Sequence, residues 1–117
     1  MKTPRLSLLA ALSFLLSPRA ALPAEPKIER LWKVHCTSCH GADGRGNADM
    51  AKEVGVDAKL LNLGRPEAAG ITRDQKRERL LKGKEKMPAY EPKLKPEQVE
   101  PLLDLSIELA EAIRGKK

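Results

Sequence analysis

The stretch Cys36-Thr37-Ser38-Cys39-His40 decides how this chain of 117 residues folds, and it contains both cysteines and one of the two histidines. Side chains three and four positions apart lie on the same face of a helix. Cys36, Cys39 and His40 are therefore predicted to project to one side of a single turn. Two cysteines only three positions apart also argue against a small scaffold held together by disulfides.

The spacing C-x-x-C-H is the attachment sequence of c-type haem. Two thiols on one turn can add to the two vinyl groups of a porphyrin, while the imidazole that follows binds the iron. We predict one covalent haem c, with thioethers to Cys36 and Cys39 and with His40 as an axial ligand. A zinc site would need four ligands, and His35 is the one further Cys or His. A thioredoxin-like dithiol would need a preceding strand, whereas residues 26–35 have a helical pattern, so both alternatives are weaker but stay open.

Three residues are candidates for the second axial ligand: Met50, Met87 and His35. Met87 is the predicted ligand, because it lies between the charged segment 82–86 and Pro88, where a methionine has no evident packing role. Pro88 restricts the local backbone and would help to hold the thioether in place. Met50 is expected to pack in the core, and His35 is too near Cys36 to reach the far face of the porphyrin. An open or exchangeable site is the other alternative.

Residues 27–114 resemble the small bacterial class I cytochromes c. The resemblance is carried by CTSCHGADGRGN at 36–47 and GKEKMPAY at 83–90, since that family commonly has C-x-x-C-H-G-x-D-G-x-G near its start and M-P-x-aromatic before its last helix. It implies an all-α fold of about four to five short helices wrapped around one haem, with His/Met coordination and periplasmic transfer of single electrons. The family often pairs a Gly in the first helix with an aromatic in the last. Ile28 and Leu105 stand at those places, so we expect aliphatics and Trp32 to fill the helix crossing.

Residues 1–24 have the layout of a secretory signal peptide. A short basic start precedes an apolar run at 6–16, and small residues up to Ala24 provide a cleavage site. The run is shorter than the about 20 residues that span a bilayer, which argues against an anchor. We therefore expect residues 25–117 to form one exported cytochrome c domain in the periplasm, with 93 residues, a net charge of +3 and no membrane span.

Apolar spacing and breaker residues predict helices at about 27–39, 48–55 and 72–83, and a last helix from Pro96 or Pro101 to about Arg114. Thr72 with Gln75 matches a capping box, and Gly83 is expected to end that helix.

Leu60, Leu61 and Leu63 are expected to line the porphyrin edge or the core. His40 is expected to donate its other ring N–H to a backbone carbonyl, with Pro66 as a candidate.

Basic residues concentrate around Met87. The whole chain has a net charge of +6, and the segment 76–95 alone carries +5. We expect a patch around Lys82, Lys84 and Lys86 to dock an acidic redox partner protein. An ordinary solvated surface is the alternative. Nucleic-acid binding is not expected, because only 3% of the residues are aromatic.

With both axial positions filled, the iron would have no place for a substrate. We therefore expect an electron carrier that is monomeric and not an enzyme. The alternative is a ligand-binding or weakly peroxidatic c-type haem protein in which Met87 is displaceable.

Overall fold

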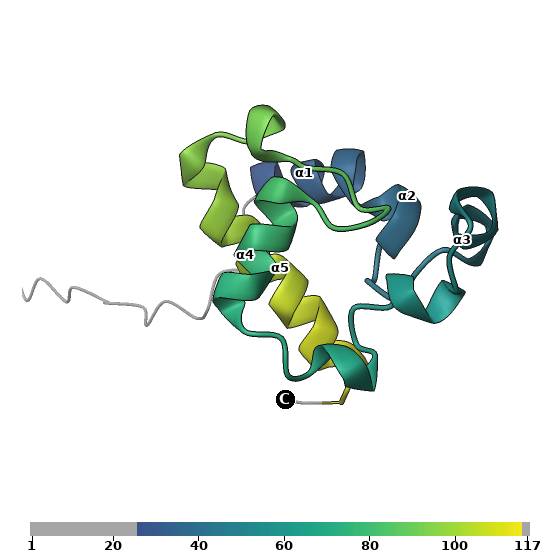
Figure 1. Ribbon diagram of the computed structural model, residues 1–117. Helices are drawn as coiled ribbons and strands as arrows, with labels where there is room; N and C mark the ends of the chain where they lie inside the picture. Colours follow the sequence, from purple (N-terminus) through teal and green to yellow (C-terminus); the bar gives the residue numbers. More distant parts are fainter. Residues whose placement is uncertain (1–25, 116–117) are drawn as a thin grey trace, which may run out of the picture.

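The computed structural model describes residues 26–115, so the predicted signal peptide at 1–24 lies outside the described part. The described residues form five α-helices: α1 Pro26–His35, α2 Thr37–His40, α3 Ala48–Val54, α4 Arg73–Lys82 and α5 Pro96–Ile113 (Figure 1). Three short 3₁₀ helices connect them: η1 Ala58–Leu61, η2 Pro66–Ala68 and η3 Glu91–Lys93. The expected all-α fold is confirmed, and residues 26–115 contain no sheet.

The core lies where α5 packs against α1 and α4. Ile28 and Trp32 of α1 are buried in the same cluster as Leu102 and Leu103 of α5, while Leu105 is half-buried against it. Aliphatic side chains and the one tryptophan thus fill the contact between the first and last helices, as expected.

The first helix is shorter than the sequence pattern predicted. It ends at His35, and Cys36 has a φ of −116° before α2 begins. The Cys36 N–H still donates to the Trp32 carbonyl at 2.8 Å, and the His40 N–H donates to the Cys36 carbonyl at 2.9 Å. The turn therefore persists through the interruption and keeps Cys36, Cys39 and His40 together.

The predicted helix ends at α3 and α4 are confirmed. Asn47 accepts from two N–H groups at the start of α3, and Gly55 follows its end with a φ of +76°. At α4, Thr72 and Gln75 form the predicted capping box, and Gly83 terminates the helix. These caps satisfy backbone groups that a helix end leaves without partners.

Helix α5 begins at Pro96, the earlier of its two prolines. Pro101 therefore lies inside the helix, where it has no N–H to donate and costs about 3 kcal/mol. Val99, Leu102 and Leu103 are buried around it, at 8%, 2% and 3% exposure. Burying such side chains contributes roughly 1.5–3 kcal/mol each, so together they outweigh the cost of the proline.

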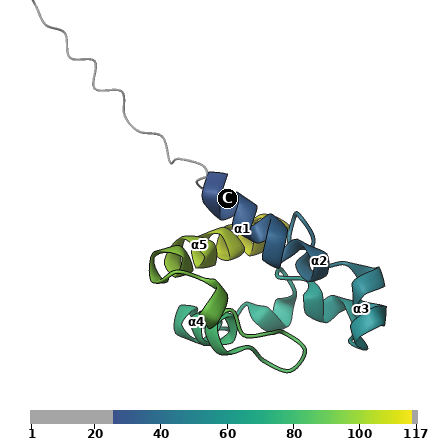
Figure 2. The same ribbon diagram turned by 90° about the horizontal axis from the view of Figure 1, so that it is seen from above.

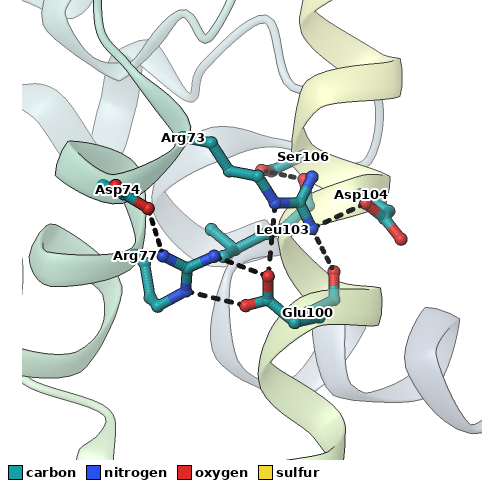
Figure 3. A network of polar contacts seen from close by, with 7 residues as sticks. All are labelled: Arg73, Asp74, Arg77, Glu100, Leu103, Asp104 and Ser106. Atoms are coloured by element: carbon teal, nitrogen blue, oxygen red, sulfur yellow. Dashed lines mark hydrogen bonds and ion pairs between the residues drawn. The ribbon is translucent and has the colours of Figure 1, made fainter.

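A polar network on the surface joins α4 to α5 (Figure 3). Arg77 donates to both carboxylate oxygens of Glu100, at 2.6 and 2.8 Å. Arg73 contacts Glu100 at 3.3 Å and Asp104 at 2.8 Å. The hydrogen bond from Arg77, supported by Arg73, lowers the pKa of Glu100 from 4.5 to about 2.

Glu100→Gln is expected to lower the melting temperature at pH 7 by a small amount, because exposed ion pairs contribute little. Since the folded-state pKa of Glu100 is depressed, its contribution is present above pH 4.5 and is lost as the pH falls towards about 2. Circular dichroism melts from pH 7 to 2 measure the difference from the unaltered protein, with the exposed Glu108→Gln as the control. A difference that persists at pH 2, or equal shifts in both variants, would contradict the assignment.

None of the helices within residues 26–115 combines the length and the apolar character needed to cross a membrane.

Candidate haem site

One cavity of about 450 Å³ brings the predicted site residues together. In Figure 2, α1 and α2 run along one side and α4 with the loop that follows it runs along the other, and the cavity is lined from both sides. Cys36, Cys39 and His40 line it from the α1–α2 side, and Met87 lines it from the loop. Met50 is not among its lining residues.

The orientation of His40 is set by a backbone carbonyl. Its Nδ1 lies 2.8 Å from the oxygen of Leu61, at the end of η1. A carbonyl only accepts hydrogen bonds, so the proton is on Nδ1 and Nε2 keeps its lone pair. The expected kind of partner is present, but Pro66 was the wrong residue: Leu61 supplies the carbonyl. Burial lowers the pKa of His40, which favours the neutral imidazole that a metal needs.

The glycine-rich loop after His40 folds back onto α2. The Gly46 N–H donates to the His40 carbonyl at 2.7 Å, and the Asn47 N–H donates to the Cys39 carbonyl at 2.9 Å. These bonds satisfy carbonyls at the end of α2. The Leu63 N–H donates to the Gly44 carbonyl at 2.8 Å, so the loop is joined to the segment that holds Leu61. Backbone hydrogen bonds therefore hold both the turn that carries His40 and the segment that carries Leu61, the two partners of the imidazole hydrogen bond.

Met87 is carried by a tight turn after α4. Lys84 and Met87 exchange two backbone hydrogen bonds, at 2.9 and 3.0 Å, and Glu85 between them has a φ of +52°. Gly83 precedes the turn with a φ of +77°, and a Cβ there would lie 2.6 Å from the Met87 carbonyl oxygen. The backbone of this turn thus helps to determine where Met87 enters the cavity.

The walls of the cavity are largely apolar. Leu60, Leu61 and Leu63 line it as expected, together with Leu80, Leu102 and Leu103. Trp32 also lines the cavity, and its ring N–H donates to the Gly41 carbonyl at 3.1 Å. Such walls favour a large flat apolar ligand that is held by a few polar groups.

Three cationic side chains also line the cavity, and sequence reasoning did not find this role for them. Arg65, Lys76 and Arg79 all line the cavity. Burial lowers the pKa of Arg65, and the nearby Arg79 lowers it further. Burial likewise lowers the pKa of Lys76, with Arg114 adding to the effect. Three cations gathered at an apolar cavity suit a ligand with carboxylate groups, and Arg65 shows no pattern in the sequence that could have marked it.

The donor set fits a covalent haem. Two free thiols share one turn, and burial raises the pKa of Cys36 to about 11, with Cys39 adding to it. One imidazole nitrogen and one thioether face the same cavity, and the cations that line it suit the two carboxylates of a porphyrin. Within residues 26–115, no group of three or more His, Cys, Asp or Glu side chains could hold a metal ion, so the zinc alternative lacks ligands.

Five α-helices around a cavity with a C-x-x-C-H turn define the class of c-type cytochromes. The sequence matches the family described as cytochrome C oxidase, cbb3-type, subunit III, over residues 23–104, and the chain belongs to this family. A solved structure named KustC0563 c-type cytochrome is similar, at 25% identity and a TM-score of 0.58, and the match covers 76% of this chain and 96% of that chain. No curated protein sequence matches the chain. Membership implies haem-based electron transfer, and members of this class are usually carriers without enzymatic activity.

Gly83→Ala is expected to destabilise the folded protein by about 1–3 kcal/mol, because its backbone conformation is one that only glycine adopts readily. The added Cβ would also press on the Met87 carbonyl. Chemical denaturation of the holoprotein measures the change in the free energy of unfolding. Gly70→Ala is the matched control, since a Cβ there meets nothing within 4 Å. Equal stabilities of the two variants would contradict the close approach at Gly83.

Proposed function

We propose that this protein carries single electrons on one covalently attached haem, bound through thioethers at Cys36 and Cys39 and ligated by His40 and Met87. The observation that carries the proposal is the single cavity lined by all four of these side chains. Bound haem would supply one-electron redox chemistry at its iron.

The residues of the chain have separate tasks in this proposal. Leu61 holds the imidazole of His40 so that Nε2 is free to bind. As a ligand together with His40, the thioether of Met87 would favour the reduced state of bound haem and raise its redox potential. The leucines of the cavity would exclude water from the haem, which would also raise its redox potential. Arg65, Lys76 and Arg79 would pair with the carboxylates of the porphyrin.

We propose the periplasm as the place of action. The support is the pattern of residues 1–24, which resembles a signal peptide, together with the C-x-x-C-H sequence, whose bacterial attachment chemistry occurs outside the cytoplasm.

Covalent attachment predicts that haem stays on the chain after denaturing electrophoresis. The unaltered protein is expected to stain for haem on such a gel, and Cys36→Ala/Cys39→Ala is expected to lose the stain completely. An unstained wild-type band would contradict covalent attachment and favour the dithiol alternative.

Met87→Ala is expected to lose the absorption band of the Met–iron bond and to bind carbon monoxide readily in the ferrous state. The unaltered protein should resist carbon monoxide, because a firmly held thioether occupies the site. Met50→Ala is the matched control, since Met50 does not line the cavity. Ready binding of carbon monoxide to the unaltered protein would instead favour the ligand-binding or peroxidatic alternative.

We further propose that Lys82, Lys84 and Lys86 dock an acidic redox partner. All three are exposed, and Lys84 and Lys86 also line the cavity. Within the described residues, none of them forms an ion pair. Positive charge beside the opening would raise the rate of encounter with a negative surface.

Lys84→Glu/Lys86→Glu is expected to slow reduction by an acidic flavodoxin on the order of tenfold at low salt, because the steering charge is reversed. Stopped-flow rates over a range of salt concentrations should show a weaker salt dependence as well. Lys27→Glu/Lys33→Glu makes the same change of net charge on exposed residues of α1, outside the cavity. Equal slowing of both double variants would leave net charge, and not this patch, as the cause.

A further inference from the structure

Tyr90 joins two parts of the chain that are far apart in sequence. It follows Met87 by three positions, and its hydroxyl donates to the backbone carbonyl of His35 at 2.8 Å. His35 is the last residue of α1 and directly precedes Cys36. Carbonyls in the last turn of a helix lack partners within the helix, so this one is available to an outside donor. Within the described residues, no other hydrogen bond joins the segment 84–94 to α1 or α2.

The ring of Tyr90 is held from several directions. The imidazole of His35 meets it edge-on, with ring centroids 5.6 Å apart. The Nζ of Lys93 lies over the ring, 5.6 Å from its centroid, and makes a cation–π contact with it. Its backbone N–H donates to the Leu80 carbonyl of α4 at 3.0 Å. Tyr90 is therefore a fixed point to which both α1 and α4 are attached.

The loop that carries Met87 lies between two such attachments. At one end, Gly83 and the paired backbones of Lys84 and Met87 tie it to the end of α4. At the other end stands Tyr90. The exposed residues Pro88 and Ala89 have little packing of their own. The hydroxyl of Tyr90 therefore makes the hydrogen bond that ties this loop to the end of α1, next to the helix turn bearing the two thiols.

We propose that Tyr90 is a positioning residue that, through its hydrogen bond to the His35 carbonyl, keeps the Met87 loop closed over the cavity and so limits displacement of the Met87 thioether. This inference rests on the proposed ligation by Met87. Tyr90 also lines the cavity, but the proposed effect on the Met87 thioether acts through the backbone of the loop.

Tyr90→Phe removes only the hydroxyl and keeps the ring with its contacts to His35 and Lys93. The loss of one part-buried hydrogen bond is expected to shift the balance between closed and open loop by about three- to tenfold. The ferric holoprotein should therefore bind imidazole about three- to tenfold more tightly, and its Met–iron absorption band should disappear at correspondingly lower imidazole concentrations.

The matched control is Thr72→Ala, which removes a capping hydrogen bond at the other end of α4 and is expected to lower stability without touching the loop. Imidazole titrations and thermal melts are measured for the wild-type, Tyr90→Phe and Thr72→Ala holoproteins. Tighter imidazole binding in Tyr90→Phe alone supports the inference, whereas equal affinities in all three, or an equal rise in both variants, overturn it.

The two levels of the proposal fail differently. The wild-type ferric protein could lack the Met–iron band, and Met87→Ala could bind imidazole with the same affinity as the wild type. In that case ligation by Met87 is wrong, and the proposed role of Tyr90 is wrong as well. If the band is present and Tyr90→Phe leaves the imidazole affinity unchanged, the ligation stands and the positioning role alone is overturned.

Discussion

The hydrogen bond from His40 Nδ1 to the Leu61 carbonyl is the interaction on which the rest of the site depends. It fixes which nitrogen of the imidazole is free, and it brings the turn of α2 against the end of η1 and the segment that follows. Backbone bonds from Gly46, Asn47 and Leu63 hold the two sides of this contact together. Gly64 lets the same segment approach α5, because a Cβ there would collide with Ile113. The orientation of the His40 imidazole is thus supported by the loop after α2, by the segment that carries Leu61 and by helix α5.

The basic segment around Met87 is divided among three tasks. Arg77 points towards α5, where Glu100 neutralises it. Lys76 and Arg79, on the same helix, line the cavity instead. Lys82 and the lysines of the Met87 turn are exposed to solvent. A single charge count therefore conceals a structural ion pair, a set of cations that line the cavity and an exposed patch, which differ in burial and so in electrostatic effect.

Several local features could be predicted because their physical causes are local. The capping box of α4, the glycines that end α3 and α4, and the shared face of Cys36, Cys39 and His40 all depend on residues within a few positions of each other. The break at Cys36 and the start of α5 at Pro96 were harder to predict. In both places, burial of neighbouring side chains such as Trp32 and Leu102 offsets an irregular backbone, and that gain depends on partners elsewhere in the fold.

The sequence by itself determined the C-x-x-C-H turn, the methionine with its following proline, and the all-α class, because spacing along a chain sets which side chains share a turn. Only the tertiary structure decided that Leu61 and not Pro66 orients His40, that Arg65, Lys76 and Arg79 line the same cavity, and that Tyr90 reaches the end of α1. These pairings join residues that chain spacing leaves unrelated. They form only when the packing of α5 against α1 and α4 brings distant loops to hydrogen-bonding distance.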